Sequence, residues 1–305
     1  MSRCFMLIGV PTAGKSSWCK ENPQIERISS DEIRKEWGIL GTSEEDKSKN
    51  ALVFEEVLKR AKKAVKENKD FVIDATNINS KRRINFLKQF NCEKIGVVFA
   101  TPIEECLKRN SKRERKVPEK VINRMYRNFQ PPHYSEGFDK ILVYSNGEKN
   151  GLEKLMAKNL DCEHDNPNHS SNCGLHCIKT EMNLVSAYGV ALKGKKMAKE
   201  LKILTAAARY HDISKFKVKT FTNFKGEKTK EAHFFNHSNV SAYDWLCYAP
   251  EDFHTDEKIE VANLISNHMV FFNKDIAPIL KIEERYGKKF MSMLNLLHKA
   301  DISAH

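Results

Sequence analysis

The sequence predicts an α/β domain with a parallel sheet and flanking helices, followed by a second domain that is all α-helical. In the first half of the 305 residues, short apolar runs alternate with charged stretches of helical periodicity. Such alternation is typical of strands joined by crossover helices. From about residue 174 onward only helical periodicities remain. We place the boundary near residue 155, which gives domains of residues 1–155 and 156–305, in keeping with about 100–200 residues per domain.

The elements of the first half follow from their apolar runs. We expect strands at residues 4–10, 71–74, 95–100 and 141–144. A further strand should end near Ile28. Amphipathic helices are expected at residues 50–68 and 80–90. This order of strand and helix predicts parallel pairing.

The second half lacks a convincing strand. Residues 161–173 are rich in Asp, Asn, His and Ser, which indicates a linker or entry loop. The apolar periodicity then predicts helices at residues 200–212, 236–248, 257–269 and 288–303.

Charge and composition narrow the choice of partners and compartment. The chain has 52 Lys and Arg against 40 Asp and Glu, a formal charge of +12, which favours polyanionic partners such as nucleic acid. No apolar run approaches the roughly 18 residues that a membrane span needs, so no membrane partner is expected. The first residues lack the features of a signal peptide, and the eight cysteines are too sparse for a disulfide scaffold. We therefore expect a cytoplasmic protein with reduced thiols.

Residues 9–16, GVPTAGKS, match the phosphate-loop pattern G-x-x-x-x-G-K-[ST] in full. The motif lies between a predicted strand and a predicted helix, which is the context that it requires. Its backbone N–H groups would surround the phosphates of ATP, Lys15 would reach the outer phosphates, and the Ser16 hydroxyl would ligate Mg²⁺. The residues expected to contact the nucleotide here are Gly9, Thr12, Ala13, Gly14, Lys15, Ser16 and Ser17.

Three polar residues at predicted strand ends suit phosphoryl transfer. Asp31 and Arg34 are three apart and would share one face of a helical turn. Asp31 would accept the proton of an acceptor hydroxyl, and Arg34 would hold the acceptor's phosphate. The alternative is an ordinary helix-capping Asp beside a solvated Arg. Asp74 would support Mg²⁺ through water, or simply make a turn at the end of its strand.

Residues 108–127 carry nine basic and two acidic side chains, a net charge of +7. Such a run is usually a solvated face. Beside a phosphate loop, it favours a lid whose arginines clamp the phosphates of ATP.

Four separated motifs of the first half together resemble those of phage and bacterial polynucleotide 5′-hydroxyl kinases. They are the loop GVPTAGKSSW, the pair Asp31-x-x-Arg34, residues 74–79 with Arg82 and Arg83, and residues 107–113 followed by Val117-Pro118. The resemblance implies a P-loop kinase domain that phosphorylates the 5′-OH end of RNA or DNA with ATP. It also implies that Asp31 is the general base, that Arg34 binds the acceptor's 3′-side phosphate, and that Arg113, assisted by Arg109, is the lid arginine.

Eight of the eleven histidines lie between residues 164 and 268. With nearby aspartates they form an ordered set of candidate metal ligands, namely His176, His211, Asp212, His237, His268 and Asp301. Imidazole and carboxylate ligands suit Mn²⁺, Fe, Ni²⁺, Co²⁺ or Zn²⁺. Helices of a bundle can direct such ligands inward, and the sequence therefore predicts a metal site in the second domain.

The order H…HD…H…H…D resembles the HD phosphohydrolase superfamily, which implies an HD-type helical domain. Residues 211–215, HDISK, match its HD-x-x-K form. The resemblance implies that His176, His211, Asp212 and Asp301 bind a first metal, and that His237 and His268 bind a second metal or the scissile phosphate. Lys215 would contact the substrate phosphate, and His169 would touch the substrate.

A rival interpretation is a structural zinc site within residues 162–177. Its candidate ligands are Cys162, His164, His169, Cys173, His176 and Cys177. If His176 belonged to that site, the hydrolase would lose a ligand.

A 5′-end kinase joined to an HD hydrolase resembles bifunctional end-healing enzymes. The partners so implied are ATP, RNA or DNA ends, and a nucleic-acid ligase that joins the healed ends. The hydrolase would remove a 2′-phosphate or a 2′,3′-cyclic phosphate. One alternative is a small-metabolite or nucleoside kinase fused to an HD nucleotide phosphohydrolase, and another is that one half is a catalytically inactive binding module.

Overall fold

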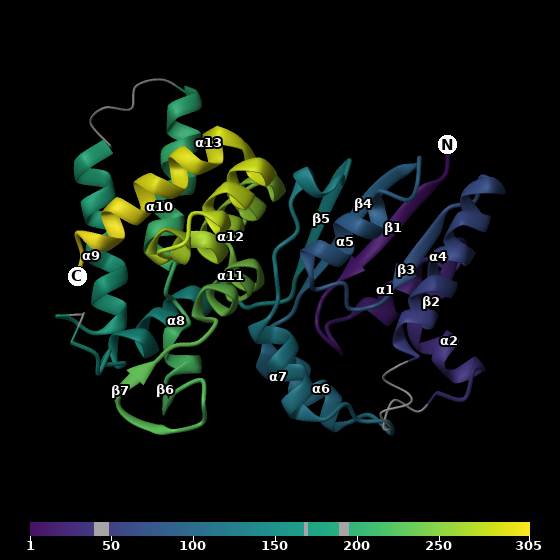
Figure 1. Cartoon of the computed structure of the whole chain (residues 1–305), viewed down its shortest axis with the longest axis horizontal. Helices are drawn as coiled ribbons and strands as arrows, with labels where there is room; N and C mark the ends of the chain where they lie inside the picture. Colours follow the sequence, from purple (N-terminus) through teal and green to yellow (C-terminus); the bar gives the residue numbers. More distant parts are fainter. Residues whose placement is uncertain (40–48, 168–169, 189–194) are drawn as a thin grey trace. The chain divides into compact units, whose positions relative to one another are not determined.

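A computed structural model of the chain describes residues 1–39, 49–167, 170–188 and 195–305. The chain forms two compact units, of which the first comprises residues 1–122 and 132–144 and the second comprises residues 123–131 and 145–305 (Figure 1). The second unit thus begins at residue 145 rather than near 155, and it includes a short segment from the first half of the sequence.

The first unit is built on a five-stranded sheet. The strand order is β2-β3-β1-β4-β5, formed by Glu26–Ser29, Phe71–Asp74, Arg3–Ile8, Glu93–Ala100 and Lys140–Ser145. β1 pairs in parallel with both β3 and β4, and β2 pairs in parallel with β3. The prediction of a parallel-sheet α/β domain is confirmed.

Helices lie between these strands along the chain. They are α1 (Lys15–Glu21), α2 (Ser30–Glu36), α4 (Asn50–Lys66), α5 (Ser80–Leu87), α6 (Ile103–Ser111) and α7 (Glu119–Arg127), with a 3₁₀ turn η1 at Tyr134–Glu136. In α4 the residues Val53, Val57 and Ala61 recur every four positions and pack, with Phe71 and Ile73 of β3, in one buried cluster. Because full burial of a valine contributes about 1.5–3 kcal/mol, this stripe is what fixes α4 on the sheet.

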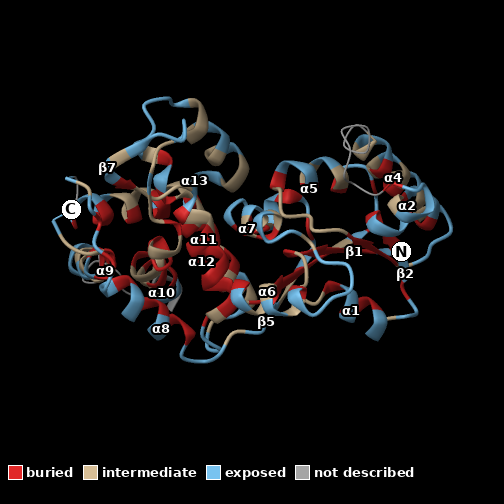
Figure 2. Cartoon of the chain, turned by 90° about the horizontal axis from the view of Figure 1, so that it is seen from below, coloured by how far each residue is buried: buried red, intermediate tan, exposed pale blue. Residues whose placement is uncertain are grey.

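The second unit is mainly helical. Its helices are α8 (Gly151–Leu160), α9 (Cys173–Tyr188), α10 (Lys195–Tyr210), α11 (His237–Tyr248), α12 (Thr255–Asn267) and α13 (Ala277–Ile302), with 3₁₀ turns η2 (Lys215–Val218) and η3 (His268–Phe272). α11 and α12 are the most deeply buried of them (Figure 2). Residues 237 and 240–247 of α11 are all buried, because neighbouring helices surround it on all sides.

Two expectations for this unit were wrong. A two-stranded antiparallel hairpin, β6 (Thr220–Thr222) and β7 (Lys228–His233), lies where no strand was expected, so the unit is not all α-helical. Its strands are short, their register is irregular, and β7 is mostly exposed, so the sequence shows no apolar alternation there. The last helix begins at Ala277 rather than at residue 288, and it continues across a kink at Gly287, whose φ is 83°.

Among the described residues, no helix has both the length and the apolar character needed to cross a membrane.

Candidate functional site

The phosphate loop lies between β1 and α1, and its backbone forms hydrogen bonds with residues outside the loop. The Gly9 N–H donates to Thr76 O at 3.0 Å, and the buried Thr101 hydroxyl donates to Ala13 O at 2.8 Å. A Cβ at Gly9 would lie 3.0 Å from Phe99 O, and Gly14 has a φ of 114°. Both glycines are therefore required by this path of the chain.

Lys15 begins α1 and is buried, with 8% of its surface exposed. Its Nζ donates to Gly9 O at 2.9 Å and to Val10 O at 2.7 Å. Burial lowers its pKa to about 8, although the Asp74 carboxylate opposes this shift. Ser16 and Ser17 are exposed on the first turn of α1, where their hydroxyls are accessible. The ammonium group thus lies inside the loop that the sequence predicts to receive phosphates.

The structure brings Asp31 and Arg34 together on α2. Arg34 Nη1 donates to Asp31 Oδ1 at 2.9 Å, and Arg34 Nη2 donates to Asn50 Oδ1 at 3.1 Å. The Asp31 side chain is 88% exposed, whereas that of Arg34 is 22% exposed. A helix-capping role for Asp31 is not seen, because Ser29 is the cap and its side chain accepts from Glu32 N–H.

Asp74 ends β3 and has a partner that the sequence did not indicate. Arg27 of β2 donates to Asp74 Oδ2 through Nε at 2.9 Å and through Nη2 at 2.5 Å. Arg27 also donates to Glu32 at 2.6 Å. Because parallel strands end at the same edge of the sheet, Asp74 and the phosphate loop share that edge. A role for Asp74 toward Mg²⁺ stays a prediction.

The predicted lid residues lie at the end of α6. Arg109 donates to Glu105 at 2.9 Å, and Arg113 is exposed in the connection that follows. The buried Asn110 shapes this connection: it donates to Val117 O at 2.8 Å and accepts from Val117 N–H at 2.9 Å. The basic run is not one structural piece, because its residues from 123 onward belong to the second unit.

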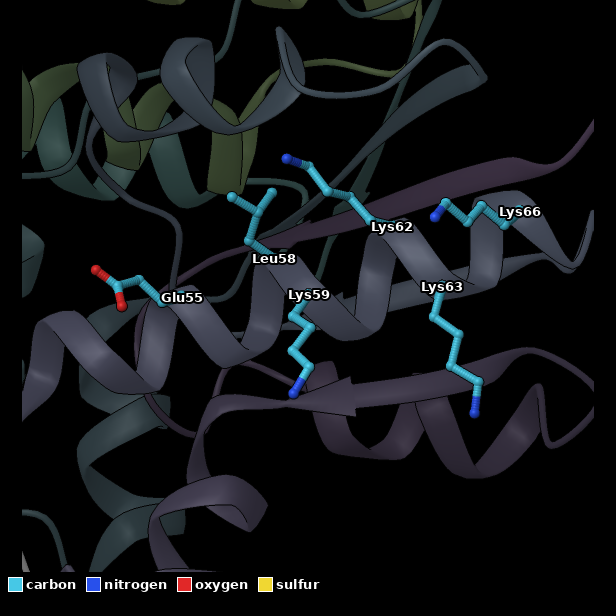
Figure 3. Close-up of a pocket in the computed structure, with 6 residues that line it drawn as sticks. All are labelled: Glu55, Leu58, Lys59, Lys62, Lys63 and Lys66. Atoms are coloured by element: carbon cyan, nitrogen blue, oxygen red, sulfur yellow. The ribbon is translucent and has the colours of Figure 1, made fainter.

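A shallow groove of about 510 Å³ on α4 carries none of these groups. Figure 3 shows the side chains that line it, which are Glu55, Leu58, Lys59, Lys62, Lys63 and Lys66. All six come from one exposed stretch of helix. We interpret this groove as a solvated face of α4.

In the second unit, six predicted ligands converge from four helical elements and from the turn that follows a fifth helix. His176 comes from α9, His237 from α11, His268 from the end of α12, and Asp301 from α13, while His211 and Asp212 directly follow α10. All six are buried, at 9% exposure or less. They form overlapping groups whose ligand atoms lie within 4.8 Å of one another. The expectation that separate helices direct these side chains to one place matches what the structure shows.

Asp212 lies between two sets of ligands. Its Oδ2 is 3.6 Å from His211 Nε2 and 4.0 Å from His176 Nε2. Its Oδ1 is 3.2 Å from His237 Nε2 and 3.5 Å from His268 Nε2. Asp301 Oδ1 completes the first set, at 2.9 Å from His176 Nε2. A carboxylate in this position can bridge two cations.

The histidine rings are oriented so that Nε2 faces the cluster. The Nδ1 atoms of His211, His237 and His268 contact the backbone carbonyls of Ala208, Phe234 and Ile265 at 2.7–2.8 Å. If each Nδ1 donates its proton there, Nε2 has a lone pair that points inward. Those Nε2 atoms would then face other acceptors, and Asp212 Oδ1 accepts no hydrogen bond from the described residues. A divalent cation between these atoms would satisfy them, so the residues present fit a metal.

The pKa shifts of the cluster histidines agree with a role as metal ligands. Burial lowers the pKa of His268 to about 3, and burial also lowers the pKa of His176 and His237. These rings are therefore neutral, as metal ligands must be. Burial alone would also lower the pKa of His211, but Asp212 and Asp301 raise it to about 9. The two carboxylates thus favour positive charge at the point on which the ligands converge.

Lys215 lies at the edge of the cluster. Its Nζ donates to Asp212 Oδ2 at 2.8 Å and is 3.2 Å from His164 Nε2. Burial opposes its charge, but Asp212 outweighs burial and raises its pKa. Sequence reasoning named His164 only as a candidate ligand of the rival zinc site. It missed His305, whose Nε2 is 3.7 Å from Asp301 Oδ1 and which lies in no motif.

The structure gives the rival zinc site no support within the described residues. Cys162 Sγ and Cys173 Sγ are 3.6 Å apart, but no cysteine belongs to any of the candidate ligand groups. Cys177 contacts the amide of Asn159 instead. His176 belongs to the cluster with Asp301. His169, which both interpretations named, lies outside the described residues.

The fold and loop define the first unit as a P-loop α/β domain of the kinase-like type, joined to a helical region. Residues 5–132 match the family AAA_33, described as an AAA domain. The L-seryl-tRNA(Sec) kinase of Methanococcus maripaludis is 28% identical over 225 residues, which cover 66% of this chain and 85% of that protein.

Two solved structures are similar to parts of this chain. A chain of the Pnkp1/Rnl/Hen1 complex has 21% identity and a TM-score of 0.33, over 38% of this chain and 41% of that one. A fungal RNA kinase has 16% identity and a TM-score of 0.32, over 67% of this chain and 95% of that one. The domain match and the loop together make the first unit a kinase of the P-loop type.

Proposed function

We propose that this chain heals nucleic-acid ends with two separate centres. The first unit phosphorylates a 5′-OH end with ATP and Mg²⁺. The second unit, an HD-type phosphohydrolase, removes a 2′-phosphate or 2′,3′-cyclic phosphate from the other end with a divalent transition metal. The observation that carries this proposal is the presence, in one chain, of a phosphate loop and of a buried cluster of six histidine and aspartate ligands.

In the kinase centre, each residue has a role that its position supports. Lys15 and the loop N–H groups hold the phosphates of ATP, and Ser16 would hold Mg²⁺. Asp31 accepts the proton of the 5′-OH. At the same time the oxygen of that hydroxyl bonds to the γ-phosphorus of ATP, and ADP leaves. Arg34 holds the acceptor's phosphate. Its hydrogen bonds to Asp31 and Asn50 fix the guanidinium group in position for this contact. Arg113, with Arg109, closes over the transferred group from the connection after α6.

In the hydrolase centre, the ligand set would hold one or two metal ions, which supply Lewis acidity and an activated water when bound. His176, His211, Asp212 and Asp301 hold the first, and His237 and His268 hold a second or contact the scissile phosphate. Lys215 is held at the edge of the cluster by Asp212, where its ammonium group can bind a substrate phosphate. Burial of the whole set keeps these contacts in a low dielectric.

A second candidate for the kinase centre follows from the curated relative. That protein is a kinase of L-seryl-tRNA(Sec), and its similarity extends over 66% of this chain. The acceptor hydroxyl would then belong to a seryl group on tRNA. Asp31 would take the same proton in either case, because both acceptors are primary alcohols.

One assay separates these candidates from the alternative of a small-metabolite kinase. The full chain is incubated with Mg²⁺ and ATP labelled in the γ-phosphate, together with a 5′-OH oligoribonucleotide, a seryl-tRNA or a nucleoside. The proposal expects label on the oligonucleotide. Label on seryl-tRNA or on the nucleoside alone would reject it in favour of that acceptor.

The hydrolase centre is tested in parallel with Mn²⁺, Ni²⁺ or Co²⁺ on two oligoribonucleotides, one with a 2′-phosphate end and one with a 2′,3′-cyclic phosphate end. We expect a free 2′,3′-diol to form from at least one of them. If both ends stay unchanged with every metal, this half of the proposal is rejected.

A further inference from the structure

The β6–β7 hairpin and the segment after it bring exposed aromatic rings close to the histidine–aspartate cluster. Phe224 lies at the hairpin turn with 88% of its surface exposed. Its ring centroid is 3.8 Å from that of Phe235, to which it is tilted by 39°, and the Phe235 ring stacks on His233 at 5.3 Å with an interplanar angle of 7°. We call the group of Phe224, Phe235 and His233 the aromatic platform.

The turn that carries Phe224 is held in one shape. Asn223 Oδ1 accepts from the N–H groups of Lys225 and Glu227 at 2.9 and 3.0 Å, and Asn223 N–H donates to Glu227 O at 2.9 Å. Gly226 supplies the positive φ of 84° that the turn requires. These hydrogen bonds fix the turn, so the exposed Phe224 ring has a defined position at its tip.

The aromatic platform is close to the histidine–aspartate cluster along the chain. Phe235 is only two residues before His237, so their Cα atoms are within about 7 Å. Phe234, between the platform and the cluster, has its ring 5.0 Å from Lys215 Nζ, and its carbonyl contacts His237 Nδ1. The platform therefore lies next to the cluster along the chain, and Phe234 contacts residues of the cluster on one side of it.

The charge of the hairpin suits a polyanion. Residues 217–230 carry Lys217, Lys219, Lys225, Lys228 and Lys230, against the single acidic Glu227, with Glu231 following. Lys217 is paired with Asp244 and Lys219 with Asp165, whereas Lys225, Lys228 and Lys230 are exposed. Aromatic rings interleaved with lysines are the usual means of binding single-stranded nucleic acid, in which bases stack and phosphates meet cations.

We propose that the aromatic platform binds the terminal base of a single-stranded nucleic-acid end whose phosphate lies at the histidine–aspartate cluster. This inference rests on the proposed hydrolase activity of the second unit. The aromatic platform is the element by which that hydrolase would select a polynucleotide end over a small phosphoester. The base stacks on the exposed face of Phe224, and the neighbouring phosphates lie near the hairpin lysines.

The test uses the full chain and a single-stranded trinucleotide whose 3′-terminal nucleotide carries 2-aminopurine and a 2′-phosphate. Stacking on a ring quenches 2-aminopurine, so we expect the wild type to quench its fluorescence. Phe224→Ala should abolish most of the quenching and weaken binding about five- to hundred-fold, the range of one lost stacking contact. Phe224→Trp should retain both, and Ile276→Ala, a control at another exposed apolar residue of this unit, should match the wild type.

Two results would overturn the inference. One is equal quenching by wild type and Phe224→Ala. The other is equal affinity for this trinucleotide and for a matched one with an abasic 3′ end. Phosphate release from the same trinucleotide, measured separately with Mn²⁺, keeps the two proposals distinct. Quenching without release would reject the hydrolase and support the platform, and release without quenching would do the reverse.

Discussion

Lys15 is the residue whose environment has the most direct consequence for nucleotide binding. It is buried among loop carbonyls, and its pKa is lowered to about 8. Phosphates placed beside it would favour its charged form and raise that pKa. Binding of ATP should therefore be coupled to protonation of this one side chain.

We predict that binding of ATP takes up protons above pH 8. At pH 8.5, roughly three quarters of Lys15 is deprotonated before binding, so uptake should approach that fraction of a proton. Calorimetry in two buffers of different ionisation enthalpy measures it. Lys15→Arg, which stays charged throughout, is the control and should take up none. Equal uptake by the wild type and this variant would show that Lys15 does not titrate there.

Asp31 offers a second test at this scale. Asp31→Asn keeps the shape of the side chain but cannot accept the proton, so phosphorylation of the 5′-OH end should fall by about 10²–10⁴-fold. The dissociation constant for ATP should stay near that of the wild type, because the side chain is exposed and outside the loop. If affinity for ATP is lost as well, Asp31 has a structural role instead.

At the scale of elements, apolar periodicity predicted those parts of the chain in which one face is buried. The stripe of α4 and the strands of the sheet lie near the expected residues. The hairpin could not be predicted, because it is short and lysine-rich and is held mainly by turn hydrogen bonds. The start of α13 was missed because Gly287 interrupts the pattern while the helix continues through a kink.

In the candidate sites, too, some residues could be predicted from sequence patterns and others could not. The phosphate loop and the His211-Asp212 pair lie in local motifs, so their spacing could be recognised, and the other cluster ligands were expected from their order along the chain. The pairing of Arg27 with Asp74 depends on which strands are neighbours, and the approach of His305 to Asp301 depends on how α13 packs. Side-chain partners of this kind are set by tertiary structure, and the sequence has no pattern that reveals them.

The bridging position of Asp212 gives a prediction for the cluster. Because its two oxygens face different ligand sets, Asp212→Asn should reduce the content of bound Mn²⁺ in both. His237→Ala should remove only the ion of the set that contains His268. Elemental analysis after dialysis against Mn²⁺ measures these ratios. A His237→Ala protein with the same metal content as the wild type would exclude His237 as a ligand and favour its contact with the scissile phosphate.

At the scale of the whole molecule, each unit contains its own candidate centre. The phosphate loop, Asp31 and Arg34 lie in the first unit, and all six cluster ligands lie in the second. A chain that both adds and removes phosphate would suit a broken nucleic-acid strand, because its two ends need opposite reactions. A phosphate must be added at one end and removed at the other before a ligase can join them.

The most direct test of this account incubates the full chain with a cleaved RNA that bears 5′-OH and 2′,3′-cyclic phosphate ends, and then reads both termini. The wild type should yield a 5′-phosphate and a 2′,3′-diol. Lys15→Met should lose only the first product, and His211→Ala only the second. Loss of both products in either variant, or no change at either end with the wild type, would contradict two independent end-healing centres.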